Sequence, residues 1–237
     1  IYPGGINSPQ LAQKYQLVGD QIKNFDQQVM SSEPTSEKIA DLADLAQTIG
    51  SGLGTISIFI NGLASVDYGN SVYGPQFNKL GKLFVDFSVP LNKFQKLLLS
   101  LDESSFAQAL TSPRLEQIAF YLTELRTDAK RLLDDATEAL INQFDLDGQQ
   151  AWSQHYDTIS ASLSMNYTDS EDSKTRHISA GQALNMLDGE PNNDTRANIM
   201  SNYEKMWGNA ENLTADTLNH LAGFRLTNQN AHGRQSH

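Results

Sequence analysis

The chain has 237 residues and a formal net charge of −11 at pH 7, so its surface should repel nucleic-acid phosphates and anionic lipid. It contains no cysteine, which excludes disulfides, thiolate zinc ligands and cysteine nucleophiles and fits a cytoplasmic protein. Its opening residues lack the basic and apolar regions of a signal peptide, and its most apolar stretch, residues 53–66, is too short to cross a bilayer. We therefore expect neither nucleic acid nor a membrane as a partner.

Helical periodicity dominates the first half of the sequence. Apolar residues recur there at spacings of three and four, the period of an amphipathic helix. The predicted helices are residues 8–30, 36 to about 62, 77–98 and 104–110. Residues 67–75 hold two glycines and a proline and are expected to form a loop. Pro90 lies inside the third helix and predicts a kink near Phe87.

The second of these helices is rich in glycine, at positions 50, 52, 54 and 62. Each glycine weakens a helix by up to about 1 kcal/mol relative to alanine. Close packing of a neighbouring helix on this small-residue stripe would offset the loss. A phosphate-binding loop is the alternative, but it requires a strand before the glycines, whereas helical periodicity runs through them. The pattern therefore favours close helix packing.

In the second half of the sequence, the spacing of apolar residues changes once from a helical to an alternating pattern. Ser112 and Pro113 are typical of a helix start, with serine as the N-cap and proline in the first turn. Alternating polar and apolar residues later predict a β-hairpin over about 160–179, with its turn at 169–174. The predicted helices of this half are 113–132, 135–144, 152–159, a short one begun by the capping box of Ser179 and Gln182, and 194–227.

These elements predict an all-α fold: a multi-helix lobe, layered or bundle-like, with one small β-hairpin over about 160–179. We divide the sequence into an N-terminal helical segment, residues 1–112, and a second helical segment with the hairpin, residues 113–237. The polar end, residues 228–237, is expected to be mobile. No internal repeat is evident.

The histidines do not form a zinc motif. They are His155, His177, His220, His232 and His237. None begins His-Glu-x-x-His, and no two have the i, i+4 spacing that directs two imidazoles at one metal. We expect His155 to bond a carboxylate or a backbone carbonyl, His220 to face the core or a cleft, and the last two to lie in the polar tail. No catalytic, cofactor-binding or metal-binding residue is predicted in this chain.

Neighbouring carboxylates could serve acid–base catalysis, but their positions favour structural roles. Asp134 with Asp135 and Asp145 with Asp147 flank predicted helix ends, where aspartate caps the helix and interacts with its dipole. Glu171 and Asp172 lie in the hairpin turn. No carboxylate is visibly placed in an apolar site, as a general acid requires. The large aromatics expected in the core, rather than as binding platforms, are Phe84, Phe87, Phe94, Trp152 and Trp207.

Several runs of residues carry a family resemblance through their order and spacing. They are Tyr2-Pro3-Gly4-Gly5, Ile118-Ala119-Phe120-Tyr121-Leu122, Leu140-Ile141-Asn142, Asp147-Gly148-x-x-Ala151-Trp152-x-x-x-Tyr156, Arg196 with Tyr203 and Trp207, and Leu218-Asn219-x-Leu221-Ala222-Gly223-Phe224-Arg225-Leu226. In these runs the chain resembles the N-terminal region of oligoendopeptidase F-type zinc metallopeptidases, which belong to the thimet-oligopeptidase-like family. The resemblance is good from Leu115 onward and loose before.

The resemblance implies a mostly helical, two-lobed body around a channel that admits short peptides, with the N-terminal lobe as a channel wall. In this family zinc is bound in the C-terminal lobe by the two histidines of His-Glu-x-x-His and a later glutamate. This sequence contains no such motif. Zinc and hydrolysis are therefore expected in a C-terminal catalytic domain, with which this chain would act on short peptides, and the chain alone is expected to be inactive. Trp152, Arg196 and Arg225 match family positions and are expected to pack the lobe.

Two interpretations remain open. An N-terminal part of a cytoplasmic oligopeptidase should leave an apolar face uncovered near Phe224. A stand-alone helical module that binds peptides or a partner should expose few apolar patches. The sequence contains no group of residues that supports a third interpretation, a different kind of enzyme.

Overall fold

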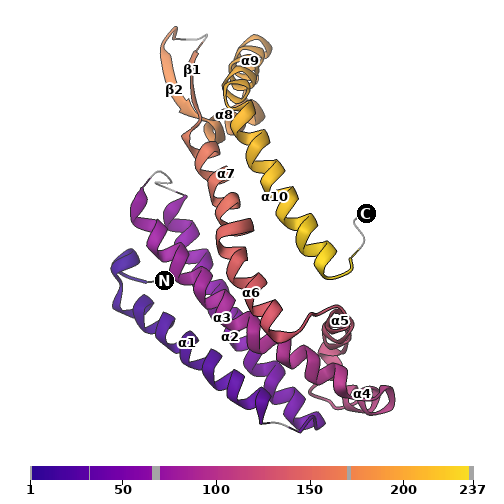
Figure 1. The fold of residues 1–237 in the computed structure, drawn as a ribbon. Helices are drawn as coiled ribbons and strands as arrows, with labels where there is room; N and C mark the ends of the chain where they lie inside the picture. The colour runs from indigo at the N-terminus through magenta and orange to yellow at the C-terminus, as the bar shows by residue number, and fades with distance from the viewer. Residues whose placement is uncertain (1, 32, 66–69, 170–171, 235–237) are drawn as a thin grey trace. The chain divides into compact units, whose positions relative to one another are not determined.

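The computed structural model describes residues 2–31, 33–65, 70–169 and 172–234, and these are mostly helical (Figure 1). The helices are α1 (Pro9–Met30), α2 (Ser36–Ala64), α3 (Gly74–Ser100), α4 (Glu103–Leu110), α5 (Ala119–Ala129), α6 (Asp135–Asp145), α7 (Ala151–Ser162), α8 (Ala180–Gly189), α9 (Asn193–Asn209) and α10 (Glu211–Ala231). Strands β1 (Ser164–Thr168) and β2 (Thr175–Ser179) form one antiparallel hairpin. The predicted all-α class with a small hairpin is confirmed. Among the described residues, no helix has both the length and the apolar character needed to span a membrane.

The chain forms two compact units. Unit 1 comprises residues 1–146 and 228–237, and unit 2 comprises residues 147–227. The segment boundary that we placed after residue 112 lies inside unit 1. There α3 and α5, one on each side of that boundary, pack against each other.

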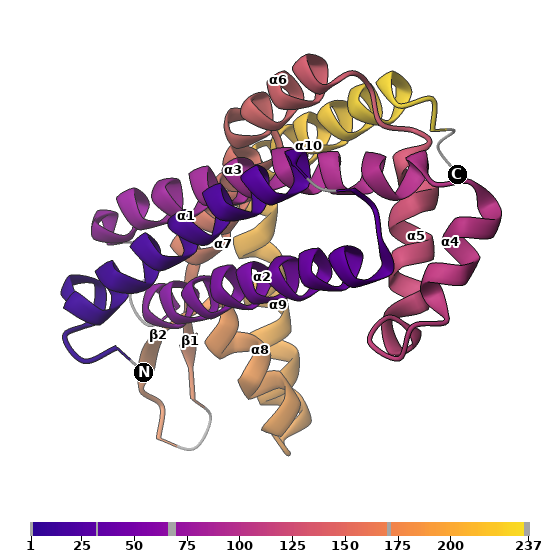
Figure 2. The same ribbon diagram turned by 90° about the horizontal axis from the view of Figure 1, so that it is seen from below.

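Unit 1 is built on three long helices that lie side by side, α1, α2 and α3 (Figure 2). Each presents one apolar stripe to the others, as the spacing predicts. The fully buried side chains of this core include Val18, Phe25, Ile49, Leu53 and Phe94. α3 continues without a break through Pro90 and also packs on α5 and α6. Phe84, predicted in the core, is instead 41% exposed, because it lies off the buried stripe of α3.

The helix predicted to begin at Ser112 begins later. Residues 116–118 form a 3-10 turn, and α5 begins at Ala119 and ends at Ala129. The backbone N–H of Leu115 donates to the carbonyl of Ser112 at 2.9 Å, and the Leu115 side chain is fully buried. Ser112 therefore opens a turn through its backbone carbonyl, and burial of Leu115 fixes that turn. The predicted start was wrong by one or two helical turns.

Unit 2 packs the hairpin against α8 and α9. Met165 pairs with Ile178 across the two strands, and both side chains are buried. The predicted capping box is confirmed: the Ser179 hydroxyl accepts from the N–H of Gln182, and the Gln182 side chain accepts from the N–H of Ser179. The first strand begins at Ser164 rather than at 160, because residues 160–162 still belong to α7. Part of the predicted turn, residues 170–171, lies outside the described residues.

The single long helix predicted over residues 194–227 is two helices. α9 ends at Asn209, and Ala210 leaves the helical conformation at φ −102° and ψ 5° before α10 begins. Gly208 and Asn209 are poor helix formers, and Ala210 is buried, so the chain turns there without exposing apolar surface. α10 then continues to Ala231, which corrects the expectation of a mobile tail from residue 228. Residues 235–237 and, in the predicted loop, 67–69 lie outside the described ranges.

Candidate functional site

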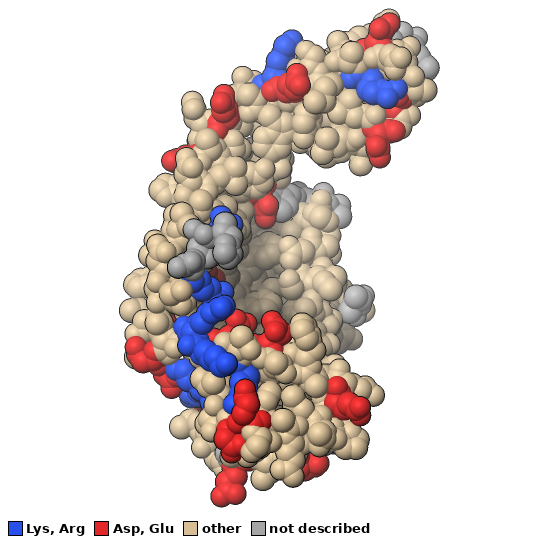
Figure 3. All heavy atoms as spheres, turned by 90° about the vertical axis from the view of Figure 1, so that its right-hand side faces the viewer, with Lys and Arg blue, Asp and Glu red and all other residues tan. Residues whose placement is uncertain are grey.

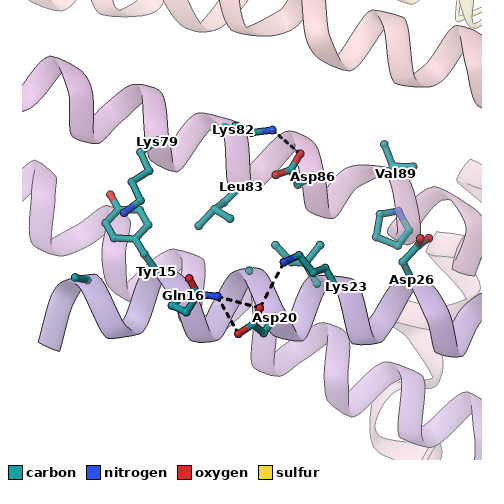
Figure 4. Close-up of a pocket in the computed structure, with 14 residues that line it drawn as sticks. Tyr15, Gln16, Asp20, Lys23, Asp26, Lys79, Lys82, Leu83, Asp86 and Val89 are labelled. Carbon is teal, nitrogen blue, oxygen red and sulfur yellow. Dashed lines mark hydrogen bonds and ion pairs between the residues drawn. The ribbon is translucent and has the colours of Figure 1, made fainter. Parts of the chain in front are cut away.

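A groove of about 620 Å³ runs between α1 and α3 in unit 1 (Figure 4). Its lining residues recur at helical spacing on one face of each helix. From α1 they are Ala12, Tyr15, Gln16, Gly19, Asp20, Ile22, Lys23 and Asp26, and from α3 they are Lys79, Lys82, Leu83, Asp86, Val89 and Pro90. The helices run in parallel here, since Tyr15 bonds Gln76 and Asp26 bonds Lys93.

The floor of the groove is apolar and small. A β-carbon on Gly19 would lie 3.8 Å from the Leu83 Cδ2 atom, so a larger residue there would occupy the groove. The floor thus offers apolar contact surface.

Tyr15 and Lys79 form the polar end of the groove. The Lys79 ammonium lies 4.1 Å from the centroid of the Tyr15 ring, a cation–π contact. The Tyr15 hydroxyl donates to the carbonyl of Gln76 at 3.2 Å. Burial raises the pKa of Tyr15 to about 12, so its hydroxyl is a neutral donor at physiological pH.

The remaining charges of the groove form ion pairs. Lys82 lies 3.2 Å from Asp86, and Lys93, next to the groove, lies 2.7 Å from Asp26. Lys23 lies 3.6 Å from Asp20, which also accepts from Gln16. Such a groove can bind a ligand that presents apolar surface and both charges. Its lining residues contain no nucleophile–base pair, so they give it no evident catalytic chemistry.

Sequence reasoning missed this groove, because the periodicity of α1 and α3 was interpreted only as a core face. Positions 12, 16, 19, 23 and 26 form a second stripe beside the buried one. Two small residues on that stripe, Ala12 and Gly19, were the available signal.

The four described histidines have ordinary partners, and two of them, His155 and His220, contact the same Trp152 ring. Nδ1 of His155 lies 2.9 Å from the Thr217 hydroxyl, which itself donates to a backbone carbonyl. We expected a carboxylate or a carbonyl as the partner of His155, and the structure gives a hydroxyl instead. His177 bonds Asn166 across the hairpin. His220 is exposed and stacks on Trp152, with ring centroids 4.3 Å apart. His237 lies outside the described residues.

His232 corrects a prediction. It was expected in a mobile tail, but its Nε2 lies 2.8 Å from a carboxylate oxygen of Glu138, which is only 5% exposed. Sequence reasoning did not single out Glu138 at all. The two residues are 94 positions apart, and neither position carries a local signal for the contact.

No group of three or more His, Cys, Asp or Glu side chains within the described ranges could hold a metal ion. We therefore assign no zinc ligand among the described residues.

Two of these carboxylates, Asp134 and Asp172, have structural partners. The Asp134 carboxylate caps α6 by accepting from the N–H groups of Ala136 and Thr137. The hydroxyl and N–H of Thr137 lower the pKa of Asp134. Asp172 pairs with Arg176 of β2 at 2.8 Å. Glu171 lies outside the described residues.

The glycines of α2 serve packing at one position. A β-carbon on Gly52 would lie 2.7 Å from Cγ2 of Val18, so α1 packs directly on this residue. Nothing lies within 4 Å of such a carbon at Gly50, Gly54 or Gly62. The predicted close packing thus explains Gly52 and not the other three.

Two of the runs that carry the family resemblance meet in unit 2. A β-carbon on Gly148 would lie 2.4 Å from the Phe224 ring. Four residues after Gly148, Trp152 stacks on His220, which lies four residues before Phe224. Trp152 is half-buried, which fits its expected packing role. Arg196 and Arg225 are exposed, so they do not pack a core of the described chain as expected.

Exposed apolar side chains gather on two helices of unit 1. On α5, Phe120 is 80% exposed and Tyr121 50%, and on α6, Phe144 is 61% exposed with Leu140 one turn before it. Charges are mixed on the face drawn in Figure 3: many Lys and Arg gather in one band, others lie apart from it, and Asp and Glu lie beside both. This pattern differs from the uninterrupted basic stripe typical of nucleic-acid binding.

Comparison with known proteins identifies a family match and a shared fold. Residues 98–164 match the family model described as Oligopeptidase F. The structure of oligoendopeptidase F from Enterococcus faecium superposes with a TM-score of 0.78 at 15% identity, over 96% of this chain and 45% of that one. A presumed peptidase from Chlamydophila abortus gives a TM-score of 0.54 at 16% identity, over 95% and 39%. No curated protein matches the sequence.

These comparisons confirm the predicted resemblance to the N-terminal region of oligoendopeptidase F. The likeness to the two solved structures concerns the fold. The chain spans less than half the length of either structure.

Proposed function

We propose that this chain is the N-terminal, channel-walling part of a zinc-dependent oligoendopeptidase that hydrolyses short peptides. The catalytic zinc and its ligands belong to a C-terminal lobe, and the chain alone is inactive. The whole enzyme acts in the cytoplasm. Its partners are short peptides and the C-terminal catalytic domain.

The family match over residues 98–164 carries this proposal. It covers the end of α3, α4, α5, α6 and α7, so it links both units to one family. The shared fold over 96% of the chain extends the likeness to residues outside the match.

The exposed apolar residues of α5 and α6 add support. Phe120, Tyr121, Leu140 and Phe144 all lie within the family match. Burying one such side chain contributes about 1.5–3 kcal/mol, so leaving four in water is unfavourable. A further lobe that covered them would remove this penalty. The uncovered face expected for an N-terminal part was placed near Phe224 of α10, and not on these two helices.

Hydrolysis of an internally quenched peptide of about eight residues tests the proposal. The chain is compared with the complete product of its reading frame, each with zinc and with a chelator. We expect cleavage only by the complete product, lost with chelator and restored by zinc. Cleavage by the chain itself in the presence of chelator would overturn the proposal. A complete product that carries no zinc-dependent activity would also overturn it.

A stand-alone helical module that binds peptides or a partner is the alternative, and the groove between α1 and α3 favours it. Substitution Gly19→Leu would fill the groove, whereas Gly181→Leu on α8 meets open space. Two results together would favour this alternative. Only Gly19→Leu would lose binding of a labelled short peptide, and the reading frame would add no catalytic lobe.

A further inference from the structure

Glu138 of α6 and His232, just after α10, form a buried polar pair within unit 1. Nε2 of His232 lies 2.8 Å from Oε1 of Glu138, and the two side chains are 12% and 7% exposed. The same carboxylate oxygen accepts from the N–H of Leu133 at 2.9 Å. A buried carboxylate is thus engaged from two sides.

The second ring nitrogen of His232 fixes the number of protons. Nδ1 lies 2.7 Å from the carbonyl oxygen of Asn228, which can only accept, so Nδ1 carries a hydrogen. Nε2 faces a carboxyl oxygen, so one further proton must lie between them. This proton sits either on the imidazole or on the carboxyl group. In both cases the pair holds one proton more than a neutral imidazole and an ionised carboxylate.

The contact one turn away is also polar. Asn142 lies four residues after Glu138, and Asn228 lies four residues before His232, so an antiparallel register brings them to the same level. Asn142 Nδ2 and Asn228 Oδ1 are both buried, and neither has a bonding partner within the described residues. Two further polar side chains thus lie buried beside the pair, without a hydrogen bond at these atoms.

The charged groups around the pair have other partners. Arg234 lies 3.6 Å from Asp128 of α5, and Lys96 of α3 lies 2.6 Å from Asp135 of α6. Asp134 caps α6. Asp134 and Asp135 are exposed, and the Asp128 side chain is 49% exposed. Water screens the effect of these carboxylates on His232 more strongly than it screens the effect of the buried Glu138.

We propose that Glu138 and His232 form a proton-dependent latch that holds residues 228–234 on α6. The latch is closed while the shared proton is present. When the proton leaves, a carboxylate oxygen faces a nitrogen lone pair in a buried site, and that bond is lost. The latch therefore opens as pH rises.

The latch lies where the chain re-enters unit 1 after residue 227. Its state therefore decides how firmly the end of this returning segment is attached. The inference concerns contacts within unit 1 and does not depend on the proposed function.

Hydrogen exchange of residues 228–234 in the whole chain tests the latch at several values between about pH 6 and 9, corrected for intrinsic exchange. We expect protection to fall by about tenfold or more with rising pH, as for loss of a hydrogen bond to a charged group. Exchange of α6 in the same samples reports whether unit 1 itself stays folded.

Substitution Glu138→Gln is the matched control. Leu133 and His232 share the single atom Oε1, so a glutamine oxygen at that position keeps the Leu133 bond but cannot bond a neutral His232. We expect protection in this variant to be lower than in the wild type at pH 6 and to depend less on pH. Equal pH dependence in both proteins, or constant protection in the wild type, would refute the latch. Nitrogen NMR of His232 and carbon NMR of the Glu138 carboxyl group give a second readout in the wild type: one of the two groups must lose a proton over the range in which protection falls, and two unchanged groups would refute the proposal.

Discussion

The aromatic ring of Phe224 lies directly against Gly148, leaving no room for a side chain between them. Gly148 precedes α7 and Phe224 lies on α10, so the contact joins two runs that resemble the family and are far apart in sequence. Trp152 on His220 extends the same contact by one turn. The glycine is therefore a packing requirement: it lets α10 approach the start of α7.

Substitution Gly148→Ala should destabilise unit 2 by about 1–3 kcal/mol, because the added β-carbon would lie 2.4 Å from the ring. Both tryptophans, Trp152 and Trp207, lie in unit 2, so urea unfolding followed by tryptophan fluorescence measures this change. Gly181→Ala, which meets open space on α8, is the control and should be neutral or stabilising. An unchanged midpoint in Gly148→Ala would contradict close packing here.

Helix periodicity predicted α1, α2 and α4 well, because each buries a single apolar stripe. It failed at the boundary of α9 and α10. There Met206, Ala210 and Leu213 keep helical spacing across the break, so the pattern does not reveal it. The start of α5 was missed for a related reason: burial of Leu115 decides that turn, and burial is a tertiary property.

The candidate site was less predictable than the fold. The pair of Glu138 and His232 joins two segments that are 94 positions apart and meet only in the folded unit, and His232 looked like part of a polar tail. The groove depends on the spacing between α1 and α3. By contrast, the capping box of Ser179 and Gln182 was predictable, because its two residues are three positions apart and need no tertiary contact.

Substitution Gly52→Ala should destabilise unit 1 by about 1–3 kcal/mol, since its β-carbon would lie 2.7 Å from the buried, stiff side chain of Val18. Gly50→Ala on the same helix meets nothing within 4 Å and should stabilise by up to about 1 kcal/mol. Chemical unfolding followed by circular dichroism compares the two. Equal effects would mean that helix propensity alone governs this stripe.

Tyr15 should make the chain less stable at alkaline pH. Its pKa is raised to about 12 by burial, above the ordinary value of 10.0. The folded state thus keeps a proton that the unfolded state releases. The resulting stability is complete below pH 10 and is lost as pH rises towards 12. Thermal unfolding between these values should show a steeper decline for the wild type than for Tyr15→Phe. Identical slopes would show that Tyr15 does not titrate differently in the two states.

Asp102 should stabilise the chain only while it is ionised. Its side chain caps α4, and hydrogen bonds from the Ser104 hydroxyl and from the N–H and hydroxyl of Ser105 hold the pKa of Asp102 below its usual range. The folded state therefore favours the carboxylate. The stability it contributes is present above the ordinary aspartate pKa, about 4, and falls as pH drops below it.

Substitution Asp102→Asn keeps an acceptor at the cap but removes the charge, so it should be less stable than the wild type at pH 7 and approach it in acid. Asp157 is exposed on α7 and has no bonded partner in the part of the chain that the structure describes, so Asp157→Asn serves as the control. Thermal unfolding from neutral to acid pH measures both differences. A gap between Asp102→Asn and the wild type that stays constant with pH would mean that the cap works without its charge.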